Sequence, residues 1–167
     1  CTDAWGPAEG EGSGAPGNVV SLRELQALVG AHEWRKKGVE IPALAKLAPR
    51  GYARIHPHYG VFSPVRGEYI DLIAQAPLPT ALAKKSLAFD IGTGTGVIAA
   101  VLVRRGVQQI MGTDTDSRAL ACAADNLERL GVAAKVTLAQ TDLFPEGKAA
   151  LVVCNPPWLP AKPSAPV

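Results

Sequence analysis

A glycine-rich turn between an apolar strand and a helix constrains the fold more than any other part of this sequence. Residues 87–91 form an apolar run typical of a buried strand, residues 90–96 read Asp-Ile-Gly-Thr-Gly-Thr-Gly, and the apolar residues that follow favour a helix. Glycines let the backbone turn tightly and approach a ligand closely. The first turn of a helix adds free N–H donors. The segment therefore predicts a ligand-binding loop, and a tight turn without a ligand is the alternative.

Short apolar runs and helical stretches alternate through the second half of the chain. Strands are predicted at residues 87–91, 107–113, 135–139 and 149–154, and helices at residues 96–105 and 117–130. This alternation is typical of an α/β fold with a Rossmann-like parallel sheet and covering helices. Because crossovers are right-handed, the functional loops are expected together at the carboxyl ends of the strands.

The first half of the chain has a different texture. Residues 1–18 contain five glycines and two prolines and are expected to be a flexible tail. Residues 19–80 are expected to form a small helical section for substrate recognition, and residues 81–167 the domain that contains the sheet. Within the helical section, Ser21 and Glu24 form an S-x-x-E capping pattern that starts a helix ending near residue 37. Further helices are predicted at residues 42–47 and 66–76, on either side of an extended segment.

The spacing of the glycines separates two classes of ligand. A dinucleotide-binding loop reads G-x-G-x-x-G and would need a glycine at position 97, where this chain has Val97. The third glycine is Gly96 instead, and Asp90 opens the loop with a carboxylate that would repel a pyrophosphate. The pattern therefore favours a positively charged nucleoside and argues against an oxidoreductase that uses a nicotinamide dinucleotide.

Two more acidic residues follow the next two predicted strands. Asp114 lies about 20 residues after the glycine loop, where a carboxylate can accept the hydroxyls of a ribose. Its neighbour Asp116 precedes Ser117 and a helix, and is expected to be an N-cap. Asp142 follows the third strand and could accept an adenine amino proton while Leu143 packs on the ring. The alternative for Asp142 is a solvated loop residue.

The fourth predicted strand ends in Asn155-Pro156-Pro157-Trp158. An Asn side-chain oxygen beside the carbonyl of Pro156, which cannot join a helix, places two acceptors near one point. Such a pair suits a planar NH₂ group, and Trp158 can stack on a flat substrate. A proline-rich connection with an incidental Asn is the alternative.

Together, DIGTGTG, Thr113-Asp114, TDLF at 141–144 and NPPW resemble the class I S-adenosylmethionine-dependent methyltransferases. Within them, the sequence is similar to the N-methyltransferase branch with an (N/D)PP(Y/F/W) motif, which includes release-factor glutamine, N6-adenine, N2-guanine and small-domain RNA methyltransferases. The resemblance implies S-adenosylmethionine as cofactor. It implies that Asp90, Gly92, Gly94 and Gly96 hold the methionine portion, Asp114 the ribose, Asp142 and Leu143 the adenine, and Asn155, Pro156 and Trp158 the target nitrogen.

Two further expectations come from this resemblance. Residues 62–68 are similar to the stretch that these enzymes place over the cofactor, so Pro64 and Glu68 are candidate contacts, with loop packing as the alternative. The sheet of the family usually continues beyond a fourth strand, whereas the last residues of this chain are rich in proline. The C-terminal strands are therefore expected to be missing, and the chain to be part of a longer enzyme. A truncated, non-catalytic module that binds cofactor or nucleic acid is the alternative of another class.

The methyl acceptor is less constrained by the sequence. Between residues 34 and 66 there are seven basic residues and one acid, with aromatic residues interleaved, a pattern that suits nucleic acid. This favours an RNA or DNA base over a protein glutamine as the acceptor. A solvated helix end and a loop that covers the cofactor are the alternative reading. The net charge of +2 adds no global attraction for a polyanion.

Cysteines, histidines and apolar runs set the remaining expectations. Cys1, Cys122 and Cys154 are widely spaced without a CxxC pair, and the histidines complete no zinc pattern, so no metal is predicted. No apolar run is long enough to span a bilayer, and no secretory signal opens the chain. We therefore expect a cytoplasmic protein with no membrane partner.

Overall fold

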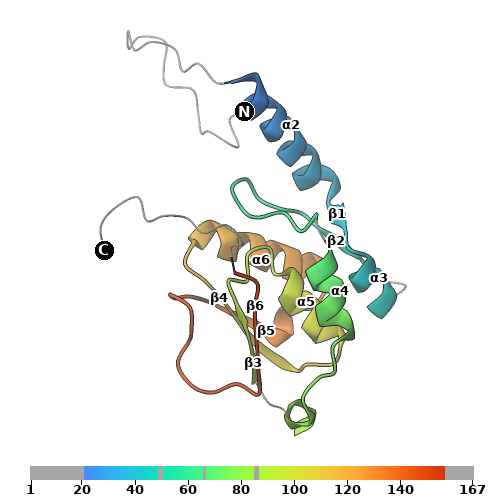
Figure 1. Ribbon diagram of the computed structural model, residues 1–167, viewed down its shortest axis with the longest axis vertical. Coiled ribbons are helices and arrows are strands. Elements are labelled where there is room, and N and C mark those ends of the chain that lie inside the picture. The colour runs from blue at the N-terminus through green and yellow to red at the C-terminus, as the bar shows by residue number, and fades with distance from the viewer. Residues whose placement is uncertain (1–20, 49–50, 66, 85–86, 157–167) are drawn as a thin grey trace.

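The computed structural model describes residues 21–48, 51–65, 67–84 and 87–156 (Figure 1). The predicted tail at residues 1–18 and Trp158 of the NPPW motif lie outside the described residues.

A parallel sheet of four strands forms the centre of the fold, as predicted. Its strands are β3 (Leu87–Ile91), β4 (Gln109–Asp114), β5 (Val136–Gln140) and β6 (Leu151–Cys154). They lie in the order β5-β4-β3-β6, and every neighbouring pair is parallel. The central strand β3 is therefore flanked by β4 on one side and by β6 on the other, so the loops after these three strands meet at one edge.

Helices α5 (Val97–Arg104) and α6 (Ser117–Arg129) connect β3 to β4 and β4 to β5. They lie on the same side of the sheet (Figure 1). Residues in register across a sheet share a face, and Ala88, Ile110, Val136 and Leu151 all belong to the hydrophobic core beneath these helices. Helix α5 is buried from Val97 to Val103 and forms the middle of that core.

The part of the chain before the sheet packs against α5. It contains α2 (Leu22–Lys37), α3 (Pro42–Leu47), α4 (Glu68–Gln75) and a two-stranded antiparallel ribbon of β1 (Val39–Glu40) and β2 (Arg54–Ile55). The three predicted helices are present, whereas the ribbon was not predicted because two-residue strands show no sequence period. Leu44, Ile55 and Ile70 are buried in the same core as α5.

Helix α2 differs from the other helices because it contributes no buried residue. The hydroxyl of Ser21 accepts a hydrogen bond from the Glu24 N–H, which confirms the predicted N-cap. The apolar residues Leu22, Leu25 and Val29 are exposed, and in Figure 1 the helix projects away from the sheet. Two short 3₁₀ turns, η1 (Thr80–Lys84) and η2 (Ala133–Lys135), precede β3 and β5. Among the described residues, none of the helices has the length and apolar character needed to cross a membrane.

Candidate functional site

The glycine loop lies at the carboxyl edge of the sheet, between the ends of β3 and β4. The N–H of Thr93 donates to the carbonyl of Thr113 at 2.8 Å. The N–H of Gly94 donates to Oδ2 of Asp114 at 3.0 Å. The structure therefore brings the predicted loop and the predicted ribose carboxylate together, although they are about 20 residues apart in the sequence.

Two glycines of this loop have different roles. Gly96 has a φ of 77°, and a Cβ at this position would lie 3.2 Å from the Cα of Ala123, so its absence lets α6 pack closely. Gly92 has a φ of 69°, but a Cβ there would have no atom within 4 Å. Gly92 is also exposed. The loop is therefore packed on the helix side and open on the side of Gly92, where a ligand can approach the backbone.

Asp90 is a buried carboxylate with one unsatisfied oxygen. Its Oδ2 accepts hydrogen bonds from Thr93 Oγ1 at 2.8 Å and from the Ala99 N–H at 3.1 Å, while its buried Oδ1 has no partner. Burial raises the pKa of Asp90 to about 6, the nearby Asp114 also raises it, and the two hydrogen bonds oppose the increase. A buried carboxylate without a countercharge suits a site that receives a cation. Oδ2 of Asp90 therefore fixes the first turn of α5, whereas Oδ1 can still accept a hydrogen bond.

The structure separates the roles of Asp114 and Asp116. Asp116 is the N-cap of α6, as predicted, since its side chain accepts from the Arg118 N–H at 2.9 Å. Asp114 accepts one backbone N–H on each oxygen, from Gly94 at 3.0 Å and from Asp116 at 3.0 Å. A carboxylate can accept about four hydrogen bonds, so Asp114 retains lone pairs for a ligand.

The loop after β5 returns to the end of β4. The N–H of Thr141 donates to the carbonyl of Asp114 at 3.2 Å, and Thr113 Oγ1 donates to the carbonyl of Leu143 at 2.8 Å. Leu143 has a φ of 55°, the one positive value among the described residues other than glycine, and its side chain is 57% exposed. Such a backbone costs about 1 to 2 kcal/mol for a residue with a Cβ. An apolar side chain held exposed in this conformation fits contact with a flat ligand, and Asp142 lies beside it in the same exposed loop.

The end of β6 meets the same edge. Cys154 is in register with Ile91 of β3, so Asn155 and Pro156 follow β6 where Gly92 follows β3. Pro156 is exposed and Asn155 is partly buried. The predicted acceptor residues are therefore adjacent to the predicted cofactor loop, and the role of Trp158 stays a prediction.

Pro64 and Glu68, the two further candidate contacts, lie just before α4 and at its first residue. Pro64 is buried, which supports the packing alternative for this residue, and Glu68 is exposed at the start of α4. Burial raises the pKa of the neighbouring Tyr69 to about 12, and the charge of Asp90 adds to this increase. Tyr69 was not predicted as a site residue, because an aromatic residue at helical spacing is typical of a core position.

Part of the basic and aromatic stretch makes contacts within the protein, whereas Lys36, Lys37 and Lys46 are exposed. The guanidinium of Arg35 lies 5.6 Å from the ring centre of Tyr59, and the Tyr59 hydroxyl bonds to His32 Nδ1 at 2.5 Å. Arg54 approaches Glu40 at 3.7 Å. The exposed Lys36 and Lys37 at the end of α2 agree with the solvated helix end of the alternative reading, and Trp34 is 42% exposed. Over the described part of the chain, no group of three or more His, Cys, Asp or Glu side chains could hold a metal ion.

A parallel sheet with a glycine loop after its central strand, and with carboxylates in the last two residues of that strand and of the next, defines a Rossmann-like α/β fold of the class I methyltransferase type. The chain belongs to the methyltransferase small domain family, whose characteristic sequence matches residues 53–164. This membership supports S-adenosylmethionine as the cofactor, as predicted from the sequence.

Three relatives of this chain are named as methyltransferases of a ribosomal protein or of a release factor. It is 30% identical over 164 residues to the ribosomal protein L11 methyltransferase of Geobacter metallireducens, covering 89% of this chain and 52% of the relative. It is 45% identical over 69 residues to that of Pelotomaculum thermopropionicum, covering 40% and 22%. It is 42% identical over 76 residues to the release factor glutamine methyltransferase of Cereibacter sphaeroides, covering 43% and 27%. The chain thus spans about half or less of the length of these relatives.

Proposed function

We propose that this chain binds S-adenosylmethionine and supports methyl transfer to a planar nitrogen of a protein. The observation that carries the proposal is the pairing of Asp90 and Asp114 around an open glycine loop at the carboxyl edge of the sheet. The cofactor supplies a methyl group on a positively charged sulfur, and all other steps depend on how the chain positions the two reactants.

The described residues of the site fit this cofactor. The unsatisfied oxygen of Asp90 stabilises a positive charge at the loop, and the open side of Gly92 admits the methionine portion. The remaining lone pairs of Asp114 accept ribose hydroxyls. Leu143 covers one face of the adenine, and Asp142 accepts its amino proton. Gly94 and Gly96 keep the loop in the conformation that these contacts need.

Asn155 and Pro156 hold the acceptor. Their two oxygens accept the two N–H groups of a planar amide or amine, which turns the nitrogen lone pair toward the methyl carbon. The cofactor, held by Asp90, Asp114 and the glycine loop, would supply the methyl group. Asn155 and Pro156 would orient the acceptor nitrogen toward it, and one N–H proton would pass from that nitrogen to solvent. Trp158 would stack on the flat acceptor group.

A protein nitrogen is the acceptor that the relatives favour, because their names specify ribosomal protein L11 and a release factor. A glutamine amide has the planar NH₂ that Asn155 and Pro156 suit. The predicted preference for an RNA or DNA base finds no support in these names. It stays the second candidate because Trp34 is exposed beside the exposed Lys36 and Lys37 in α2. In this proposal residues 19–80 recognise the acceptor and residues 81–167 bind the cofactor.

Titration calorimetry of the chain with S-adenosylhomocysteine, with NADH as a control ligand, tests the cofactor site. We expect saturable binding of the first and none of the second. Asp114→Asn should weaken binding about tenfold, which corresponds to about 1.4 kcal/mol. The matched control is Asp116→Asn, because Asn is also a good N-cap and binding should stay within about twofold. Equal losses in both variants would contradict the assignment of Asp114.

Methyl transfer by the wild-type chain and its variants is tested with radiolabelled S-adenosylmethionine. Ribosomal protein L11, release factor, RNA and DNA are offered as separate acceptors. Asn155→Ala should abolish transfer and leave the Kd for S-adenosylhomocysteine within about twofold, since Asn155 acts on the acceptor. Full transfer by this variant would refute the role of Asn155. Labelled nucleic acid without labelled protein would establish the second candidate, and binding without any transfer would indicate a non-catalytic module.

A further inference from the structure

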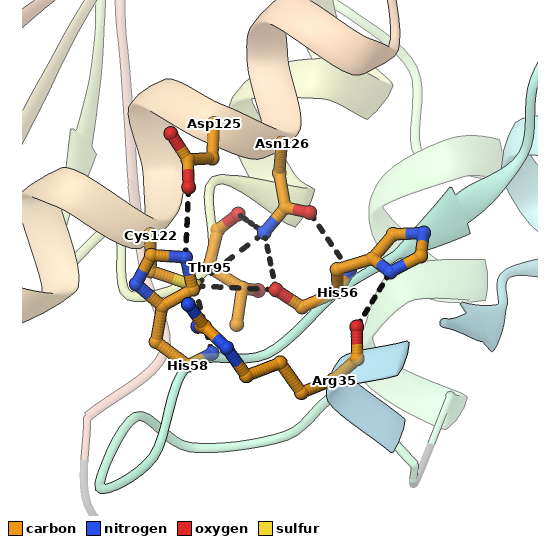
Figure 2. A network of polar contacts seen from close by, with 7 residues as sticks. All are labelled: Arg35, His56, His58, Thr95, Cys122, Asp125 and Asn126. Carbon is orange, nitrogen blue, oxygen red and sulfur yellow. Dashed lines mark hydrogen bonds and ion pairs between the residues drawn. The ribbon is translucent and has the colours of Figure 1, made fainter. Parts of the chain in front are cut away.

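Asn126 is fully buried in the last turn of α6 and makes hydrogen bonds to two segments far away in the sequence (Figure 2). Its Nδ2 donates to the carbonyl of Thr95 at 3.2 Å and to the carbonyl of His56 at 3.2 Å. Its Oδ1 accepts from the His56 N–H at 2.7 Å. One amide group therefore joins α6, the glycine loop and residue 56.

His56 begins a segment, residues 56–64, that we call the strap. Cys122, one turn before Asn126, accepts from the His58 N–H at 3.3 Å and donates to the His56 carbonyl at 3.6 Å. Burial raises the pKa of Cys122 to about 11, so at neutral pH it is a thiol that can donate. His58 also pairs with Asp125 at 2.9 Å (Figure 2). The strap is thus attached to α6 over more than one turn.

The course of the strap along α6 is shown by its contact with Arg118. A Cβ on Gly60 would lie 3.3 Å from a guanidinium nitrogen of Arg118, so the strap runs from Asn126 toward the first turn of α6. That turn directly follows Asp114 and its neighbour Asp116. The strap therefore passes the first turn of α6 at Gly60, and Asn126 holds its first residue, His56.

The bond to Thr95 distinguishes Asn126 from the other attachments. Thr95 lies between Gly94 and Gly96 and is buried. Among the described residues, the hydrogen bonds of Cys122 and Asp125 reach the strap but do not reach the glycine loop. A buried amide whose donors and acceptor are all satisfied fixes a specific arrangement, whereas an apolar residue of similar size would only fill the space.

We propose that Asn126 is a positioning residue that couples the glycine loop to the strap, so that cofactor binding and the ordering of the strap stabilise each other. The proposal rests on the cofactor site described under "Proposed function". A ligand that fixes Thr95 in its present place also fixes the Asn126 amide, and through it His56. Such coupling is reciprocal, so a strap held by an acceptor strengthens cofactor binding.

The sharpest variant is Asn126→Asp, measured at pH 8. It keeps the side-chain volume and the acceptor for the His56 N–H, but places an oxygen against the carbonyls of Thr95 and His56. We expect the affinity for S-adenosylhomocysteine to fall about tenfold, as for the loss of a buried hydrogen-bonding pair. The matched control is Asp125→Ala, which removes the hydrogen bond to His58 Nε2 and leaves the Asn126 bonds intact. Its affinity should stay within about twofold.

Hydrogen exchange of the wild-type chain supplies a measurement that does not depend on how a variant folds. Saturation with S-adenosylhomocysteine should slow exchange of the His56 amide about fivefold or more, while the Leu25 amide in α2 should not change. Unchanged His56 exchange with bound ligand, or normal affinity in Asn126→Asp, overturns the proposal. If calorimetry detects no binding to the wild-type chain, the proposed function itself has failed, and the coupling falls with it.

Discussion

Asp90 is a buried carboxylate that lowers the stability of the folded chain at neutral pH. Its pKa is about 6 when folded, against an ordinary value of 3.8, because of burial. The folded chain therefore binds more protons than the unfolded chain between about pH 4 and pH 6. The stability from this group is fully present below the unfolded pKa and is lost as the pH rises through the folded pKa. The pKa difference corresponds to about 3 kcal/mol.

From this we expect Asp90→Asn to raise the free energy of unfolding by about 1 to 2 kcal/mol at pH 7.5. An Asn oxygen can still accept from Thr93 and Ala99, and the charge is gone, although the amide lacks a partner where Oδ1 now lies. Urea denaturation at pH 5 and pH 7.5 checks this, with Glu146→Gln on an exposed loop as the control. If the variant is less stable than the wild type at pH 7.5 and its stability has the same pH dependence, other groups of the folded chain balance the charge of Asp90.

At the scale of single residues, the sequence predicted Asp90, Asp114 and Asp116 because each lies at the end of a predicted strand or the start of a predicted helix. It did not predict Asn126. A helical period shows that position 126 faces the core, but its partners are the backbone groups of His56 and Thr95. Nothing local to α6 specifies contacts that are 70 and 31 residues away.

At the scale of elements, the glycine loop must fit α6 on one side and leave space on the other. A Cβ at position 96 meets Ala123 and Leu127 at 3.2 to 3.3 Å, whereas one at position 92 meets nothing within 4 Å. Both glycines have positive φ, so the backbone strain of an added Cβ is similar at the two positions. The difference between them is therefore contact with the helix.

Because of this difference, we expect a substitution of Gly96 to affect mainly the stability of the fold and a substitution of Gly92 to affect mainly ligand binding. We expect Gly96→Ala to lower the free energy of unfolding by about 2 to 4 kcal/mol, from strain and overpacking against α6. Gly92→Ala should lower it by only about 1 to 2 kcal/mol, yet weaken S-adenosylhomocysteine binding more than tenfold because the methyl group occupies the open side of the loop. Urea denaturation and calorimetry on both variants provide the comparison. Unaltered binding in Gly92→Ala would place the ligand elsewhere.

The elements themselves were predictable where the sequence pattern is regular. All strands of the sheet and the helices between them were predicted, because buried parallel strands read as apolar runs and the glycines mark the turns. The ribbon of β1 and β2 was not predicted, since its pairing depends on Val39 meeting Ile55 across α3. Nor does the sequence show the positive φ of Leu143, which a bond from Thr113 helps to hold.

At the scale of the whole molecule, stability is unevenly distributed. The core is continuous from Ile41 and Leu44 through α5 to the sheet. Helix α2 lies outside this core and contacts the rest through its C-terminal half, where His32 and Arg35 meet Tyr59. An isolated helix of this length is marginal in water, so the first turns of α2 depend on the Ser21 cap and on little else.

We therefore expect two classes of amides in native-state hydrogen exchange. Amides in the first two turns of α2 should exchange through local opening at about 1 to 2 kcal/mol, independent of urea. Amides in β3, β4 and α5 should exchange only with global unfolding and follow its dependence on urea. Leu22, Leu25 and Val29 form an exposed apolar face, and association of copies through this face would also protect α2 from exchange. The exchange is therefore measured at two protein concentrations. Protection in α2 that rises with concentration would show that copies associate through this face. Protection equal to the global value at both concentrations would contradict the independence of α2 from the core.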